Sequence, residues 1–181
     1  MRRLLIVDRD GVINQESPSF IKHPNEWVPL PGSLRALGQA TQAGFDIFVA
    51  SNQSGLARRH LGVDDLNHIH TRLLHEAAPF GARIEAFFFC PHGPNEGCHC
   101  RKPQPGLLLA IGARSGLPLV NGVMIGDRAS DLAAARAANI KPVLVLTGHG
   151  QATAKALREE VRCPTFADLA SAVQALVSGA L

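Results

Sequence analysis

Short apolar runs alternate with segments of helical periodicity along most of the chain, and this alternation restricts the possible folds more than any other feature. The apolar runs have the length of buried strands and cover residues 4–7, 45–50, 86–89, 123–125 and 142–146. Helices are predicted at residues 33–43 with Ser33 as the cap, at residues 105–116, and at residues 129–138, where Asn139 ends the helix. Two more are predicted, one after a cap at Asp64 with Leu66, Ile69, Leu73 and Leu74 facing inward, and one after a capping box of Thr165 and Asp168. This order favours an α/β fold, a doubly wound, mainly parallel sheet with helices on both faces and right-handed crossovers.

The composition is that of one soluble domain spanning residues 1–181. Of these residues 46% are hydrophobic and 18% are charged, and a chain of this length can bury a stable core without disulfides or bound metals. No apolar run has the length of a membrane span, and no signal-peptide layout precedes the first strand, so a cytoplasmic protein without a membrane partner is expected. The net charge of +3 is scattered, which disfavours nucleic acid as a partner and suits a small anionic substrate.

Two acidic residues, Asp8 and Asp10, follow the first predicted strand. Gly11 allows the chain to turn at once, so both carboxylates can approach one ligand. Neighbouring carboxylates repel one another unless a cation or a shared proton separates them. The alternative is a strand that simply ends in solvated acids.

Polar side chains follow four of the five predicted strands. They are Asp8 and Asp10, then Ser51 and Asn52, then a cysteine segment leading to Arg101 and Lys102, then Asp127 with Asp131. The carboxyl ends of parallel strands share one sheet edge, so these side chains are predicted to converge on one site. Carboxylates offer oxygen ligands to Mg²⁺, while a hydroxyl and a lysine bind phosphoryl oxygens. The site is therefore predicted to hold a divalent cation and a phosphate.

Four motifs, in this order, resemble those of the haloacid dehalogenase superfamily of phosphatases: DRDGVIN at 8–14, SNQSG at 51–55, RKPQPG at 101–106 and GDRASD at 126–131. The CPH segment at 90–92 and the CHC segment at 98–100 resemble the D-glycero-D-manno-heptose-1,7-bisphosphate phosphatase family and its histidinol-phosphatase relatives. The resemblance covers residues 4–150. It implies the superfamily's fold without a large cap, because the segments between the first three strands are too short for one.

The resemblance also implies a role for each motif residue. Asp8 corresponds to the nucleophile that forms an aspartyl-phosphate, and Asp10 to the acid and base that serves the sugar oxygen and the hydrolytic water. Ser51 and Lys102 match positions that hold phosphoryl oxygens. Mg²⁺ is expected on the carboxylates of Asp8 and Asp127 and on the backbone carbonyl of Asp10.

Residues around these motifs are predicted to contact the rest of the substrate. Arg101 matches a position that recognises substrate beyond the reacting phosphate, and Arg128 stands where many relatives carry lysine. The remaining substrate-binding candidates are Glu16, Ser17, Pro18 and Ser19 in the loop of residues 15–31, and Asn52, Gln53 and Ser54 after the second strand. Asp131 either orients Lys102 or the metal shell, or is an acid favoured by the helix dipole.

The cysteine segment at residues 90–100 is predicted to be a zinc-binding loop. Cys90, Cys98 and Cys100 supply thiolates, and His92 is the expected fourth ligand because it matches the family's CPH, whereas His99 is expected to point away. Four protein ligands leave no open position, so the zinc would be structural. The alternative is a surface loop with reduced cysteines. Cys163 is predicted to be a small buried residue.

The expected function is that of a monomeric, Mg²⁺-dependent phosphatase with a structural Zn²⁺. Its predicted reaction removes the 7-phosphate of heptose 1,7-bisphosphate, a small phosphorylated sugar, on the route to nucleotide-activated heptose for lipopolysaccharide. The alternative is histidinol-phosphate phosphatase, although Arg101 and Arg128 favour a substrate with a second anionic group. A non-catalytic zinc or nucleic-acid-binding module is a third possibility. The presence of the motif aspartates and of Lys102 argues against it, because a module without catalysis would not need them.

Overall fold

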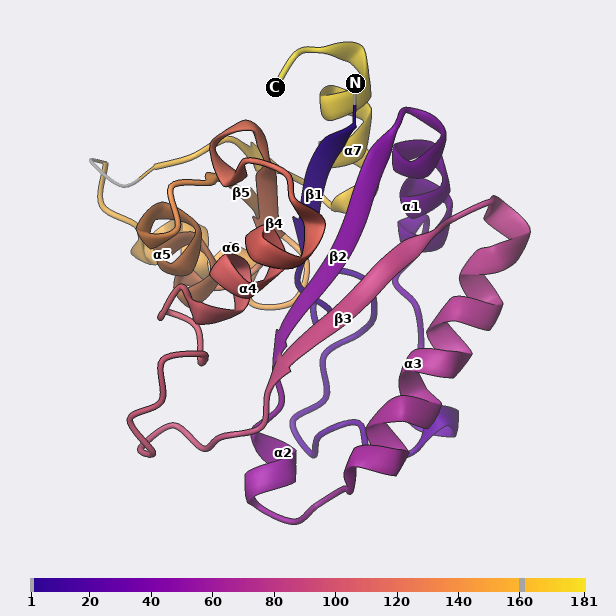
Figure 1. The fold of residues 1–181 in the computed structure, drawn as a ribbon, viewed down its shortest axis with the longest axis vertical. Helices are drawn as coiled ribbons and strands as arrows, with labels where there is room; N and C mark the ends of the chain where they lie inside the picture. Colours follow the sequence, from indigo (N-terminus) through magenta and orange to yellow (C-terminus); the bar gives the residue numbers. More distant parts are fainter. Residues whose placement is uncertain (1, 160–161) are drawn as a thin grey trace.

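Six parallel strands form the central sheet of the computed structural model, which describes residues 2–159 and 162–181 (Figure 1). The strand order is β3-β2-β1-β4-β5-β6, and each neighbouring pair is parallel. The strands are β1 (Arg3–Val7), β2 (Phe45–Asn52), β3 (Ile84–Cys90), β4 (Val123–Gly126), β5 (Lys141–Val145) and β6 (Thr165–Phe166). The predicted fold class is confirmed, and the sheet has one strand, β6, that was not predicted.

Helices cover both faces of this sheet. They are α1 (Ser33–Gln42), α2 (Ser54–Ala57), α3 (Val63–Ala77), α4 (Gly106–Ser115), α5 (Ala129–Ala137), α6 (Gly150–Ala156) and α7 (Leu169–Ser178). Short 3₁₀ turns lie at Pro24–Glu26, Ala78–Phe80 and Leu119–Asn121. None of the helices in residues 2–159 and 162–181 is long and apolar enough to cross a membrane.

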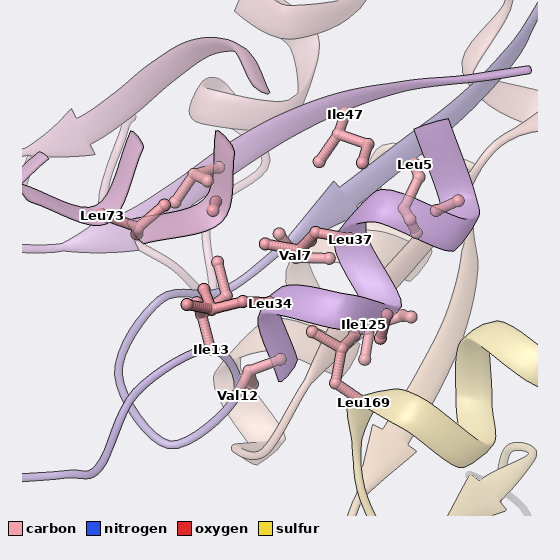
Figure 2. Close-up of a cluster of buried hydrophobic side chains, with 14 of the residues drawn as sticks. Leu5, Val7, Val12, Ile13, Leu34, Leu37, Ile47, Leu73, Ile125 and Leu169 are labelled. Carbon is pink, nitrogen blue, oxygen red and sulfur yellow. The ribbon is translucent and has the colours of Figure 1, made fainter. Parts of the chain in front are cut away.

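Alternating strand residues build two hydrophobic clusters, one on each face. Leu5 and Val7 of β1 pack with α1, α3 and α7, whereas Leu4 and Ile6 pack with α4 and α5. Figure 2 shows the first cluster, in which Leu37 of α1 lies close to Val7. Both faces of the central strands are thus buried, which is why they read as continuous apolar runs.

Three predicted helix caps are wrong, because a different residue stands at each N-cap position. Gly32, in the left-handed region at φ 77°, precedes α1, and the Ser33 hydroxyl donates to backbone carbonyls instead. Gly62 rather than Asp64 precedes α3, where its N–H donates to the Asp65 carboxylate.

At the C-terminal end, Asp168 is itself the N-cap of α7 and forms the capping box with Ser171, while Thr165 lies in β6. Two burial predictions also fail. Leu74 on α3 is 41% exposed and Cys163 is only half-buried. The predicted stop of α5 is confirmed, because Asn139 adopts a left-handed φ of 54° directly after the Ala138 cap.

Candidate active site

The carboxyl ends of β1 to β4 open into a cavity of about 380 Å³. Its wall includes Asp8 and Asp10 after β1, Gln53 after β2, Lys102 after β3 and Asp131 after β4. Strands β2 and β3 run toward this edge, with α2 beyond the end of β2 (Figure 1). The structure therefore brings together the polar residues that the sequence places after separate strands.

Lys102 lies between two carboxylates at the base of the cavity. Its Nζ is 3.0 Å from Asp8 Oδ1 and 2.7 Å from Asp131 Oδ1, and it donates to the Ala50 carbonyl at 2.7 Å. Burial lowers the pKa of Lys102, but the charges of Asp131 and Asp8 outweigh it, so the pKa lies above its usual value. Lys102 is thus a buried, permanently charged ammonium group beside Asp8.

Asp8, Asp127 and Asp131 form a buried cluster whose carboxylate oxygens lie within 4.8 Å of one another. Burial raises the pKa of Asp8 well above its usual value, and the other two acids raise it further against the opposing charge of Lys102. The pKa of Asp127 is raised to about 7, first by burial and then by Asp131 and Glu16. Oδ1 of Asp127 is buried without a hydrogen-bond partner in the described residues, so a divalent cation fits this cluster.

Close backbone approaches fix Asp127 in this cluster. Gly11 has φ 81°, and a Cβ at Gly11 or at Gly148 would collide with the Asp127 carboxylate. The His149 N–H donates to Asp127 Oδ2 at 2.7 Å, and the Thr147 hydroxyl donates to the Gly11 carbonyl at 2.6 Å. The sequence predicted the turn at Gly11, but not that the segment after β5 closes over Asp127.

Asp10 is held by side chains from two elements. Arg9 Nη2 lies 3.0 Å from each carboxylate oxygen, Asn14 Nδ2 donates to Oδ1 at 2.9 Å and Gln53 Nε2 donates to Oδ2 at 3.0 Å. Burial raises the pKa of Asp10, but the charge of Arg9 and these hydrogen bonds outweigh it and leave the pKa below its usual value. Asp10 is therefore a carboxylate in the absence of substrate.

The predicted substrate-binding residues divide into those that line the cavity and those that do not. Glu16, Ser17, Asn52, Gln53, Ser54, Arg101 and Arg128 line it. Pro18 and Ser19 are exposed outside its wall, and Ser51 is buried, where its Oγ accepts a hydrogen bond from Gln53 Nε2 at 3.3 Å. The carboxamide of Asn52 faces the main chain of Lys102, with its Oδ1 and Nδ2 each 3.0 Å from a Lys102 backbone atom.

Charged side chains from separate loops meet at the rim. Arg128 donates to Glu16 Oε1 at 3.0 Å, and His149 Nε2 lies 3.6 Å from Glu16 Oε2. Arg101 donates from Nη1 to the His92 carbonyl at 3.2 Å, and Arg58 also lines the cavity. The rim therefore carries more arginine than carboxylate and suits an anionic ligand.

Cys90, His92, Cys98 and Cys100 form a second cluster, beside the cavity. Sulfur–sulfur separations are 3.3–3.6 Å, and His92 Nδ1 is 3.5 Å from Cys90 Sγ and 3.3 Å from Cys100 Sγ. These spacings suit a tetrahedral zinc ion, whose bonds to sulfur are about 2.3 Å long. His99 is exposed and is not part of the cluster. The four predicted ligands are thus together in space and could hold a metal ion.

Comparison with known proteins supports the resemblance seen in the motifs. A family model described as HAD-hydrolase-like matches residues 99–172. The chain is 45% identical over 177 residues to the D-glycero-beta-D-manno-heptose-1,7-bisphosphate 7-phosphatase of Pseudomonas aeruginosa, covering 97% of this chain and 98% of that protein. It is 46% identical to the same-named protein of Bordetella bronchiseptica over 83% of this chain and 84% of that one.

Solved structures agree with the sequence comparison. The crystal structure of D,D-heptose 1,7-bisphosphate phosphatase from B. bronchiseptica, complexed with magnesium and phosphate, matches with a TM-score of 0.93 at 42% identity, covering 98% of this chain and 99% of that one. The corresponding phosphatase from Burkholderia thailandensis matches with a TM-score of 0.75 at 34% identity, over the same shares of the two chains. The chain belongs to the D-glycero-D-manno-heptose-1,7-bisphosphate 7-phosphatase family of the haloacid dehalogenase superfamily.

Proposed function

We propose that this chain is a Mg²⁺-dependent phosphatase that removes the 7-phosphate of D-glycero-β-D-manno-heptose 1,7-bisphosphate. The observation that carries the proposal is the buried group of Asp8, Asp127, Asp131 and Lys102, in a fold that matches a relative complexed with magnesium and phosphate. The names of the relatives favour the β anomer and do not favour histidinol phosphate.

In the first half-reaction, an Asp8 oxygen attacks the phosphorus of the substrate. Asp10, a carboxylate in the free protein, takes up a proton from solvent when the anionic substrate binds beside it. The bond between phosphorus and the sugar oxygen then breaks, and that oxygen takes this proton from Asp10. Lys102 holds a phosphoryl oxygen while negative charge builds up, which its buried position beside Asp8 supports. The products of this step are the free sugar hydroxyl and an aspartyl-phosphate on Asp8.

In the second half-reaction, water attacks the phosphorus of the aspartyl-phosphate. Asp10 takes a proton from this water, the bond from phosphorus to Asp8 breaks, and inorganic phosphate leaves. The lowered pKa of Asp10 suits this step, because a carboxylate is the form that accepts a proton. Asp10 then releases this proton to solvent, which matches the proton taken up with the substrate, and both aspartates return to the carboxylate form.

The carboxylates of Asp8 and Asp127, together with the backbone carbonyl of Asp10, are the proposed ligands of Mg²⁺. The bound ion offsets the repulsion between the Asp8 carboxylate and the anionic phosphate. The raised pKa values of Asp8 and Asp127 support this assignment, since burial and then the neighbouring acids disfavour their carboxylate forms, which a bound cation would stabilise. Asp131 is proposed to position Lys102, with which it makes the shorter of the two ion pairs.

The Cys90, His92, Cys98 and Cys100 cluster is proposed to bind one structural Zn²⁺. Its four protein ligands leave no coordination position for substrate. The proposed role is to shape the loop so that Arg101 reaches the cavity, because Arg101 is tied to the His92 carbonyl. Arg101 and Arg128 are the proposed contacts for the 1-phosphate, with Glu16 setting the orientation of Arg128.

We further propose that residues 1–181 act as one domain and that the enzyme is a cytoplasmic monomer. The packing of helices on both faces of one sheet supports the single domain. The absence of a membrane-spanning helix from the described residues is consistent with the location.

Phosphate release from the β and α heptose 1,7-bisphosphates and from histidinol phosphate, at matched concentrations with Mg²⁺, tests the function. We expect the highest kcat/KM for the β bisphosphate and no turnover by Asp8→Asn, which should keep its fold and zinc. A preference for histidinol phosphate would reject the proposed substrate, and full activity of Asp8→Asn would reject the proposed nucleophile.

A further inference from the structure

Arg9 is a buried guanidinium whose position the motifs do not explain. Its side chain is 1% exposed, although arginine is rarely buried so completely unless it is paired. The pairing is with Asp10: Nη2 lies 3.0 Å from both carboxylate oxygens, and Nε lies 3.2 Å from Oδ1. A buried ion pair adds little to stability compared with apolar packing, so this arrangement calls for another explanation.

The backbone around Arg9 is as tightly fixed as its side chain. The Arg9 carbonyl accepts hydrogen bonds from the N–H groups of Val12, Ile13 and Asn14, at 3.3, 2.8 and 3.2 Å. This turn places Asn14 so that its amide donates to the same Asp10 oxygen that receives Arg9 Nε. Arg9 therefore contacts both oxygens of the Asp10 carboxylate, while Asn14 adds a donor to Oδ1 and Gln53 adds one to Oδ2.

His70 lies near enough to this pair to feel the charges of Arg9 and Asp10, without adding a charge of its own. Its ring stacks on Phe87, with centroids 4.0 Å apart and planes inclined by 8°. Burial, and then the charge of Arg9, lower the pKa of His70 to about 3, so the ring is neutral at neutral pH. Asp10 is the one acidic partner of Arg9 in the described residues, and its own side chain remains 24% exposed toward the cavity.

We propose that Arg9 is a positioning residue: its guanidinium fixes the Asp10 carboxyl group in the orientation from which it exchanges a proton with the sugar oxygen. This inference rests on the proposed function of Asp10 as acid and base. Proton transfer requires the acid to lie within hydrogen-bond reach of the leaving oxygen, and contacts from two nitrogen atoms of one planar group restrict both the position and the rotation of the carboxyl. Because the Arg9 side chain is itself enclosed, it acts through Asp10.

The test compares kcat/KM for heptose bisphosphate and for p-nitrophenyl phosphate, because kcat/KM covers only the steps up to formation of the aspartyl-phosphate. A sugar alkoxide needs a proton when it leaves, whereas p-nitrophenolate does not. Arg9→Met is expected to lower kcat/KM for the sugar phosphate on the order of 100-fold, as expected for lost general acid catalysis, and to change that for p-nitrophenyl phosphate by only a few-fold. Arg9→Lys, which keeps the charge without the two-atom contact, should show the same pattern with a smaller loss.

A double-mutant cycle separates positioning from a merely structural role. In an Asp10→Asn background, Arg9→Met should change kcat/KM for the sugar phosphate by no more than a few-fold, because Arg9 acts through a carboxyl that is already gone. Arg72→Met is the matched control. Arg72 also pairs with an acid, Glu76 at 2.7 Å, but does not line the cavity, so its kcat/KM should match that of the wild type.

Equal losses for both substrates, or full additivity in the double variant, would overturn the role of Arg9. The Arg9→Lys variant and the double variant provide the same test if Arg9→Met does not fold. A wild-type enzyme that hydrolyses other sugar phosphates but not heptose bisphosphate would reject the proposed substrate alone. In that case the Arg9 comparison on the sugar phosphate that is hydrolysed still decides the positioning role.

Discussion

The side chain of Asn52 pairs with the main chain of Lys102 like the neighbouring strand of a sheet: its Oδ1 accepts from the Lys102 N–H and its Nδ2 donates to the Lys102 carbonyl, both at 3.0 Å. This contact joins the end of β2 to the segment after β3, fifty residues further along the chain. It places the root of the Lys102 side chain, while Asp8 and Asp131 place its tip.

Replacement of Asn52 by Leu should therefore displace Lys102 without removing its charge. We expect kcat to fall on the order of 10-fold to 100-fold, less than for Lys102→Met, whose loss should reach 100-fold or more because a donor to the phosphoryl group is gone. Steady-state kinetics of both variants measure the difference. An Asn52→Leu enzyme with wild-type kcat would show that the side chain of Lys102 is placed by Asp8 and Asp131 alone.

The raised pKa of Asp127 predicts a pH-dependent stability in protein that holds zinc but no magnesium. Asp127 has a pKa of about 7 when folded and an ordinary pKa of 3.8 when unfolded, so the folded state binds more protons between these pH values. Stability should therefore fall as the pH rises from about 4 to 7, by an amount on the order of a few kcal/mol. Thermal melts after dialysis against magnesium-free buffer at a series of pH values measure this loss.

Magnesium should reverse the same loss, because the bound ion compensates the Asp127 carboxylate. The increase in Tm on adding Mg²⁺ should thus be larger at pH 8 than at pH 5. Asp127→Asn, which carries no carboxylate at this position, should reduce both the pH slope and the Mg²⁺ response. An identical Mg²⁺-induced shift at both pH values would contradict the assignment of Asp127 as a metal ligand.

The contact between Gly11 and Asp127 makes Gly11 sensitive to a single methyl group. Gly11→Ala places a Cβ into the Asp127 carboxylate, so the Mg²⁺ concentration for half-maximal activity should rise at least 10-fold. Gly44→Ala is the matched control, because Gly44 has nearly the same φ, 83°, with nothing within 4 Å of its added Cβ. Both variants should lose about 1–2 kcal/mol of stability through backbone strain, but only Gly11→Ala should need more magnesium. Equal Mg²⁺ requirements would show that the collision is relieved locally.

The Cys/His cluster predicts a variant that loses stability before it loses chemistry. Cys98→Ser should lower the zinc content and the Tm, while p-nitrophenyl phosphate turnover at low temperature stays near that of wild type. Cys163→Ser is its control, since Cys163 is also a reduced, half-buried cysteine but lies outside the cluster. Elemental analysis and thermal melts provide the measurements. Purified wild-type protein without zinc would reject the site.

The sequence predicts the architecture well where strands are buried on both faces and flanked by amphipathic helices. The strand β6 is not predicted, because a strand of two residues, Thr165 and Phe166, is too short to show any periodicity. The cap of α1 is predicted wrongly because serine is a preferred N-cap residue type, which favours Ser33. The N-cap is instead Gly32, whose left-handed φ of 77° the sequence does not reveal.

The residues of the candidate site also divide into those that the sequence predicts and those that it does not. Residues directly after strands could be placed, because strand ends in a parallel sheet share one edge. The partners of Asp10 could not, since the contact from Gln53 depends on side-chain direction and nothing distinguishes His70 from the other histidines of α3. Arg9 stands inside the first motif, yet its burial is set by the turn at residues 9–14, which sequence spacing does not reveal.

The two neighbouring cations Arg101 and Lys102 are anchored to different parts of the molecule. Lys102 depends on β2, through Asn52 and the Ala50 carbonyl, whereas Arg101 depends on the carbonyl of His92, a member of the proposed zinc-binding cluster. Reaction and recognition would thus respond separately to the supply of zinc. In a cell starved of zinc, the enzyme would still cleave small phosphate esters but would discriminate among them poorly. Zinc deficiency would therefore lower the substrate selectivity of the enzyme rather than its turnover rate.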